Sequence, residues 1–215
     1  MLIINYYQDS NSPKRAVIGL HGWTGDEHAM VPVAKSMGLN DTKWYMPRAP
    51  YKADVGKGFT WFSGNDETGW EYEKTFELTT ALISQVLEDG FAPKDIYLIG
   101  FSMGAGLCLH VTLRLDFAIG GIIPIAGFIR NPDRLFNDAT DISRQTPILI
   151  LHGTEDDIIT VDKGQKAHDL LNEHGYSVRM ETYKAHHKIP LLAGAIIKDF
   201  IKDNELYLSV KMESK

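Results

Sequence analysis

The chain has 215 residues, a length typical of one domain, and no internal repeat or low-complexity segment divides it. Hydrophobic residues make up 44% and charged residues 23% of the sequence, which excludes wholesale disorder. The formal net charge is −6, so the chain lacks the basic excess that is typical of nucleic-acid-binding proteins. We therefore expect a single domain over residues 1–215 and no nucleic-acid partner.

Cysteine content and hydrophobic runs bear on the cellular compartment. Cys108 is the only cysteine, which excludes a disulfide within the chain and favours a reducing environment. The N-terminal residues show no basic leader followed by an apolar run, and no apolar stretch reaches the roughly 18 residues that a membrane span needs. We expect a cytoplasmic protein without a signal peptide or a membrane-spanning segment.

Short apolar runs alternate with longer helical patterns along the chain. Strands are expected at residues 16–20, 43–46, 95–100, 118–125, 147–151 and 177–183, and helices at 26–37, 72–89, 103–115, 161–174 and 189–201. The Gly-rich, aromatic stretch at 50–64 is expected to be a long loop, while the tail at 204–215 suits an edge strand, a dimer contact or a frayed end. The alternation indicates an α/β fold with a mostly parallel central sheet and helices on both faces. In such sheets, active-site and ligand-binding residues lie at the carboxyl ends of the strands.

A Gly-Phe-Ser-Met-Gly motif at residues 100–104 lies between a predicted strand and a predicted helix. A Gly-x-Ser-x-Gly turn in this context presents the serine from a sharp, strained bend, and the flanking glycines remove side chains that would clash in it. A tight Gly-rich turn of another α/β fold is the alternative interpretation. We predict that Ser102 is a nucleophile, which needs a base and a carboxylate to activate it.

The acid is expected after a strand that follows the serine, because this fold orders the triad as serine, acid and histidine. The loop after the 147–151 strand contains Glu155, Asp156 and Asp157, and chemistry alone does not separate these neighbours. Asp162 lies further on, in the predicted first turn of the next helix, where a carboxylate interacts favourably with the helix dipole. The acid is therefore expected in the 155–157 loop.

The base is expected after the last strand, where His186 and His187 are adjacent. His187 precedes a Lys-Ile-Pro segment at 188–190, and proline suits the first turn of the closing helix. His187 is thus expected at the end of the loop, facing the site. We predict that His187 is the base and that His186 is its structural neighbour.

These segments together resemble the phospholipase/carboxylesterase family of α/β hydrolases, which includes the acyl-protein thioesterases. The similar segments are Leu-His-Gly at 20–22, Pro-Arg-Ala-Pro at 47–50, Gly-Phe-Thr-Trp-Phe at 58–62, the serine motif at 100–104, His-Gly-Thr-Glu-Asp at 152–156 and His-Lys-Ile at 187–189. The Pro-x-Ala-Pro segment and the aromatic loop after it are more specific for the family than the serine motif. The resemblance implies a single-domain α/β-hydrolase fold, and 215 residues leave little room for a large lid.

The resemblance also implies residue roles. It makes Asp156 the acid of the triad and assigns the oxyanion hole to the backbone N–H groups of Trp23 and Met103. It places Trp61 and Phe62 beside the site, so we expect these two residues and Trp23 to line the acyl pocket. Packing of the aromatic loop against the sheet is the alternative for all three.

Three positions near this pocket depart from the family pattern. Thr24 stands where the family often has glycine, Met103 where it often has glutamine, and His186 where it usually has glycine. None of these changes removes a catalytic group. The resemblance therefore implies the family's reaction, and the three departures bear on which substrate is accepted.

The sequence predicts a serine carboxylesterase that forms an acyl-enzyme on Ser102 and needs no cofactor or metal ion. An open site without a large lid favours short- to medium-chain or small accessible esters. An acyl-protein or other acyl-thioesterase, or a lysophospholipase, is the nearest alternative. A non-catalytic ligand-binding protein on the same fold is a different class, but such proteins typically lack a triad member. The expected partner is a small-molecule ester, and whether the protein is a homodimer is left open.

Overall fold

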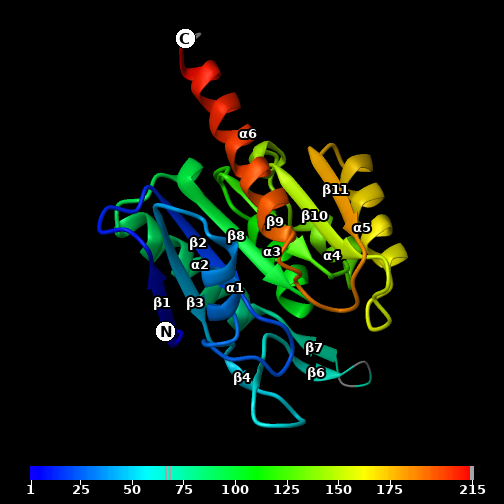
Figure 1. The fold of residues 1–215 in the computed structure, drawn as a ribbon. Coiled ribbons are helices and arrows are strands. Elements are labelled where there is room, and N and C mark those ends of the chain that lie inside the picture. Colours follow the sequence, from blue (N-terminus) through cyan, green and yellow to red (C-terminus); the bar gives the residue numbers. More distant parts are fainter. Residues whose placement is uncertain (66, 68, 214–215) are drawn as a thin grey trace.

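The structure is a computed structural model that describes residues 1–65, 67 and 69–213. Its centre is a sheet that, in the described part of the chain, has seven strands in the order β1-β3-β2-β8-β9-β10-β11 (Figure 1). The strands are β1 (Ile4–Gln8), β2 (Arg15–Leu20), β3 (Thr42–Pro47), β8 (Ile96–Phe101), β9 (Gly121–Ile125), β10 (Ile148–Gly153) and β11 (Val178–Tyr183). β1 pairs antiparallel with β3 at one edge, and the other pairings are parallel. The mostly parallel sheet that the sequence predicts is therefore confirmed.

Helices cover both faces of this sheet. α1 (Val31–Met37) and α6 (Ala193–Glu213) pack on one face. α2 (Glu73–Glu88), α3 (Met103–Thr112), α4 (Pro132–Asn137) and α5 (Val161–Glu173) pack on the other. Burial on both faces explains the composition of the central strands: β9 and β10 are buried throughout and read as nearly continuous apolar runs. Short 3₁₀ turns at Pro93–Asp95 and Ile142–Gln145 precede β8 and β10.

The stretch at 50–64 is not a plain loop, so that expectation is wrong. β4 (Tyr51–Lys52) pairs with β5 (Phe59–Thr60), and β6 (Ser63–Asn65) pairs with β7 (Gly69–Glu71). Strands of two or three residues are too short to show the alternation by which a strand is recognised in a sequence. The two small ribbons lie at the edge of the molecule near the carboxyl end of β8 (Figure 1).

The tail is helical, so an edge strand there is excluded as far as residue 213. α6 runs to Glu213 and extends away from the sheet, at the end opposite the β4 and β6 ribbons (Figure 1). The sequence from 202 to 213 contains neither glycine nor proline, so nothing stops the helix that begins at Ala193. Residues 214 and 215 of the predicted tail lie outside the described residues.

Candidate active site

Ser102 occupies a strained turn between β8 and α3. Its φ of 54° and ψ of −115° lie in a region that a residue with a side chain rarely adopts, and its backbone N–H donates to the carbonyl oxygen of Ile125 at 2.9 Å. Such conformations cost about 1–3 kcal/mol and persist where the surrounding structure enforces them. A Cβ at Gly100 would lie 2.2 Å from the carbonyl oxygen of Gly104, and one at Gly104 would lie 2.3 Å from that of Leu20. Only glycine therefore fits at either end of the motif.

Asp156 and His187 lie in the loops that follow β10 and β11. The Nδ1–H of His187 donates to Oδ2 of Asp156 at 2.7 Å, while Oδ1 accepts the backbone N–H groups of Ile158 at 3.0 Å and Ile159 at 2.9 Å. Burial by itself raises the pKa of the Asp156 carboxyl, but these hydrogen bonds outweigh burial and hold the pKa below its ordinary value. An ionised carboxylate only accepts, so the proton of a neutral His187 is on Nδ1. Nε2 is then free to act as a base.

The geometry of the two loops distinguishes Asp156 from Asp157 and His187 from His186, which chemistry alone does not. His186 is exposed, and its Nδ1 lies 2.9 Å from the carbonyl oxygen of Glu155. The exposed Asp157 points its carboxylate at neither histidine within the described residues. The carboxylate that contacts His187 belongs to Asp156.

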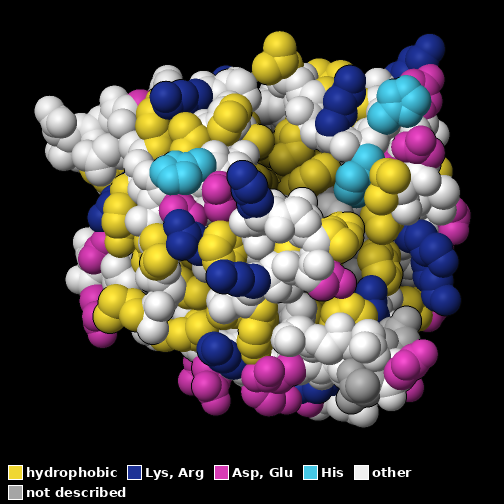
Figure 2. Space-filling view, turned by 90° about the horizontal axis from the view of Figure 1, so that it is seen from below, with side chains coloured by type: hydrophobic (Ala, Val, Ile, Leu, Met, Phe, Trp, Pro, Cys, Tyr) yellow, Lys and Arg dark blue, Asp and Glu magenta, His cyan; other side chains and the backbone are white. Residues whose placement is uncertain are grey.

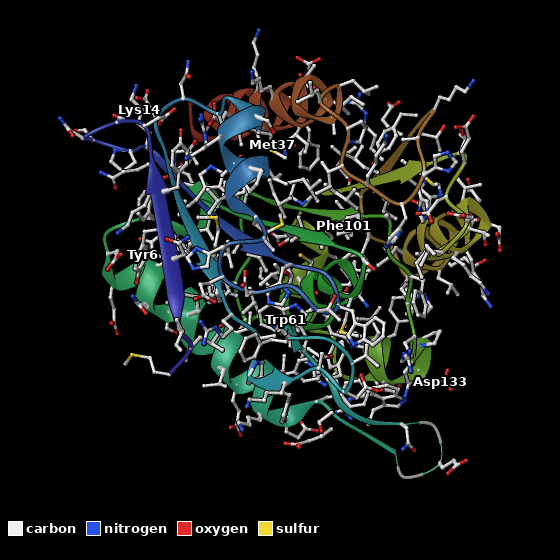
Figure 3. The ribbon with its side chains drawn as sticks, turned by 60° about the horizontal axis from the view of Figure 1, so that its bottom comes forward. Tyr6, Lys14, Met37, Trp61, Phe101 and Asp133 are labelled. Carbon is white, nitrogen blue, oxygen red and sulfur yellow. The ribbon has the colours of Figure 1, made fainter. Side chains whose placement is uncertain are left out.

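His187 also lies beside the residue that precedes the serine. The rings of Phe101 and His187 have centroids 4.8 Å apart, and Phe101 lies at the end of β8 (Figure 3). Within the described part of the chain, the Ser102 hydroxyl itself makes no hydrogen bond to His187. Such bonds are often long in free enzymes and tighten when a substrate binds.

Two backbone N–H groups are positioned next to the serine. A Cβ at Gly22 would lie 3.4 Å from the Cβ of Ser102, so the turn after β2 passes directly against Ser102. Trp23 follows in that turn, and Met103 is the first residue of α3, where a backbone N–H has no partner one turn earlier. Among the described residues, neither N–H donates to a protein acceptor. Both are free to bind a developing oxyanion.

His21 holds this turn in place through hydrogen bonds of its ring to backbone groups. Its Nδ1 lies 2.7 Å from the carbonyl oxygen of Gly22, and its Nε2 accepts the backbone N–H of Ala49 at 3.1 Å. Burial lowers the pKa of His21, which keeps the ring neutral with its proton on Nδ1. His21 thus ties the turn that carries Trp23 to the Pro-Arg-Ala-Pro segment.

Trp61 does not line the cavity beside Ser102, so the expectation that it forms part of an acyl pocket is corrected. The side chain is fully buried, its Nε1–H donates to the carbonyl oxygen of His21 at 2.8 Å, and the two rings lie 4.9 Å apart. Figure 3 shows Trp61 among the ribbons in the middle of that view. An indole N–H that is buried needs an acceptor, and the His21 carbonyl supplies it. Trp61 packs the aromatic loop against the sheet.

A cavity of about 410 Å³ opens at Ser102. Aromatic side chains line much of it: Trp23, Phe62, Trp70, Tyr72 and Phe128. Figure 2, which views the molecule from this end, shows hydrophobic side chains around a hollow in the surface. Trp23 and Phe62, two of the three residues for which an acyl-pocket role is predicted, line this cavity. The volume is in the range of small-molecule sites.

Sequence reasoning missed one wall of this cavity. Gly106 and His110 line it and follow Ser102 by four and eight residues on α3. That spacing places all three on one face of the helix, so it was a signal that the sequence offered. Trp70 and Tyr72 come from the β7 ribbon and its end, which the sequence did not reveal.

The described residues contain no group of three or more His, Cys, Asp or Glu side chains that could hold a metal ion. In the same part of the chain, no helix combines the length and the apolar character needed to cross a membrane.

Comparison with known proteins agrees with the fold. A model of the phospholipase/carboxylesterase family matches residues 6–205. Acyl-protein thioesterase 1 of Candida albicans is 32% identical over 198 residues, which cover 82% of this chain and 85% of that protein. A probable carboxylesterase SOBER1-like of Arabidopsis thaliana is 26% identical over 213 residues, covering 92% and 79%.

Solved structures agree as well. The crystal structure of Arabidopsis thaliana SOBER1 matches with a TM-score of 0.79 at 22% identity, covering 88% of this chain and 98% of that one. That of esterase PE8 matches with a TM-score of 0.81 at 25% identity, covering 93% and 99%. With a family model spanning nearly the whole chain and relatives along most of its length, the chain belongs to the phospholipase/carboxylesterase family of α/β hydrolases.

Proposed function

We propose that this hydrolase is a serine carboxylesterase that cleaves carboxylic esters through an acyl-enzyme on Ser102. The observation that carries the proposal is the hydrogen bond of 2.7 Å between His187 and the buried Asp156, at the same end of the sheet as the strained serine turn. A serine hydroxyl becomes a useful nucleophile when an oriented histidine takes its proton. The pair supplies such an oriented base.

The proposed reaction has two halves. Nε2 of His187 removes the proton of the Ser102 hydroxyl while Oγ attacks the ester carbonyl carbon, and the negative charge on the carbonyl oxygen faces the N–H groups of Trp23 and Met103. The protonated His187 then gives its proton to the departing alcohol. In the second half, His187 removes a proton from water, which attacks the acyl-enzyme carbonyl carbon. The carboxylic acid is released and the Ser102 hydroxyl is restored. Loss of one oxyanion-hole donor typically costs about 10²–10³ in rate.

The cavity supports short- to medium-chain acyl groups as substrates. Its aromatic lining suits an apolar chain, and its volume of about 410 Å³ sets a limit on the length that fits. One methylene in an apolar pocket changes discrimination by about 1–3 kcal/mol, so activity should decline gradually with acyl length beyond this limit.

Hydrolysis of acyl-thioesters is the second candidate, because a relative 32% identical to this chain is named an acyl-protein thioesterase. The proposed triad can cleave a thioester bond by the same steps as an ester bond. The mouth of the cavity is also accessible, since Lys52, Asp54 and Ile158 on its lining are exposed. An acyl group attached to a larger carrier would reach Ser102 through this opening.

A panel of p-nitrophenyl esters and matched acyl-thioesters tests the proposal. We expect wild type to hydrolyse the short- and medium-chain esters and Ser102→Ala to hydrolyse none above the uncatalysed rate. Higher kcat/KM for every thioester than for its ester would select the second candidate. Equal activity of wild type and Ser102→Ala would contradict both.

A further inference from the structure

His110 is a buried polar residue in the wall of the cavity that the proposed mechanism does not use. It lies on α3, eight residues after Ser102, and only 4% of its surface is exposed. The rise from Met103 to His110 along the helix is about 10 Å. Side chains on a helix lean towards its N-terminus, here towards Ser102. The imidazole therefore lies part of the way along the cavity from the nucleophile.

The imidazole of His110 lacks the hydrogen bonds that a buried polar group normally has. Nδ1 is buried and has no hydrogen-bond partner within the described residues. The ring packs instead against aromatic rings, with centroids 5.7 Å from Phe76 and 6.3 Å from Tyr72. Most buried polar side-chain atoms are paired, and an exception calls for an explanation. Nδ1 is sealed from the cavity, whereas Nε2, which also has no hydrogen bond among the described residues, is not sealed in this way. Nε2 is therefore the nitrogen that a hydrogen-bonding group on a bound substrate can reach.

His110 is neutral at the pH of the cell. Burial, together with the guanidinium groups of Arg114 and Arg134, lowers its pKa to about 4, although Asp138 acts in the opposite direction. A neutral imidazole carries one N–H donor and one acceptor nitrogen. It therefore suits an uncharged oxygen, such as that of a ketone, which accepts from the N–H.

We propose that His110 is a specificity-determining residue that hydrogen-bonds an oxygen carried by the acyl chain several carbon atoms from the scissile carbonyl. The preferred substrates are then oxygenated acyl esters rather than plain alkanoyl esters. This inference rests on the proposed function, because it assumes that the acyl chain on Ser102 enters the cavity.

Thr112 provides a matched control on the same helix. Its Oγ1 is also buried without a hydrogen-bond partner among the described residues, but Thr112 does not line the cavity. Thr112→Val removes this hydroxyl with little change in shape. If unpartnered polar atoms on α3 acted only through stability, Thr112→Val and His110→Phe would have the same effect on substrate preference, namely none.

The test compares p-nitrophenyl esters whose acyl chains carry a ketone at the fourth, fifth, sixth or seventh carbon with alkanoyl esters of equal length. For each pair, the ratio of kcat/KM for the keto ester to kcat/KM for the plain ester is measured. At one or two ketone positions, His110→Phe should lower this ratio about tenfold relative to wild type, as expected for one lost hydrogen bond. His110→Gln, which keeps an N–H donor, should restore part of the ratio, and Thr112→Val should leave it at the wild-type value.

An unchanged ratio in His110→Phe at all four positions would overturn the inference, as would an equal fall in Thr112→Val. Neither result touches the proposed function, which depends on the loss of activity in Ser102→Ala. The Kd values of the keto and plain esters for Ser102→Ala, with and without His110→Phe, give the same comparison without turnover. Failure of the proposed function and failure of this inference are thereby distinguishable.

Discussion

His187 Nδ1 lies 2.7 Å from Oδ2 of Asp156 because two neighbouring parallel strands end level with each other. The register pairs Gly153 of β10 with Tyr183 of β11, and backbone hydrogen bonds from Thr154 and Glu155 continue the pairing beyond the strands. The two loops therefore leave the sheet together. Residues 31 positions apart in the sequence meet with the histidine oriented by a buried carboxylate.

Removing a member of the proposed triad should abolish esterase activity without unfolding the protein. We expect kcat to fall by about 10⁴–10⁶ in His187→Ala and by about 10⁴ in Asp156→Asn, because triad members act as a unit. His186→Ala is the control, since that exposed ring contacts the Glu155 carbonyl instead. Steady-state kinetics with a p-nitrophenyl ester checks this. Near-normal activity in His187→Ala together with loss in His186→Ala would refute the assignment of the base.

Trp61 should act on stability and Phe62 on substrate preference. Trp61→Ala leaves a cavity in the core and removes the hydrogen bond to the His21 carbonyl, so the free energy of unfolding should fall by about 3–5 kcal/mol. Phe62→Ala enlarges the cavity at Ser102 and should raise kcat/KM for longer acyl chains relative to acetate. Urea unfolding and an acyl-length series measure the two effects. A chain-length profile that moves in a stable Trp61→Ala would show that Trp61 does bound the acyl site.

His110 should make the protein lose stability on mild acidification. Its pKa is lowered from 6.5 to about 4 in the folded state, so between these values the unfolded chain binds the proton and the folded chain does not. Stability therefore falls as the pH drops through this window, by up to about 3 kcal/mol from this group. His110→Phe lacks the group. The difference in free energy of unfolding between variant and wild type should shift in favour of the variant from pH 7 to pH 4.5, and a difference that is constant with pH would disprove the assignment.

The ion pair between Glu27 and Arg48 should contribute stability that acid removes. Glu27 is 7% exposed, and its hydrogen bonds with the Arg48 guanidinium lower its pKa from 4.5 to about 2. The contribution is complete above 4.5 and is lost as the pH falls through about 2. Glu27→Gln should cost about 1–3 kcal/mol near neutral pH and progressively less below 4.5.

Glu73→Gln removes the exposed partner of Arg134 and serves as the control for Glu27→Gln. It should change the free energy of unfolding by less than about 1 kcal/mol. Denaturant titrations at several pH values give all of these quantities. If Glu27→Gln lowered the free energy of unfolding by the same amount at every pH, the lowered pKa of Glu27 would be contradicted.

The central strands and the order of the site residues could be predicted because burial on both faces leaves a strong mark on the sequence. Apolar runs at 96–101 and 148–153 end where Ser102 and the Asp156 loop begin. β1, by contrast, is a half-exposed edge strand of mixed composition, and its sequence carries no comparable pattern. The helical tail was missed because Leu206, Leu208 and Val210 alternate along the sequence in the way that is typical of a strand.

The site was predicted less completely than the sheet, for a physical reason. Positions after strands singled out Ser102 as the candidate nucleophile and limited the candidate acid and base to short loops. Which neighbour in each loop turns inward depends on the hydrogen bonds of the folded loop. Trp61 is an example of the limit. Its position in an aromatic segment next to the site says nothing about which way the ring points, and the acceptor that its indole N–H reaches is a backbone carbonyl far away in the sequence.

Covalent labelling tests the central claim most directly. Wild type treated with a fluorophosphonate and digested should show one modified peptide by mass spectrometry, with the adduct on Ser102. Ser102→Ala should show none, and His187→Ala should react far more slowly, because the serine then lacks its base. An adduct on another residue, or an active enzyme that remains unlabelled, would contradict the assignment of Ser102 as the nucleophile.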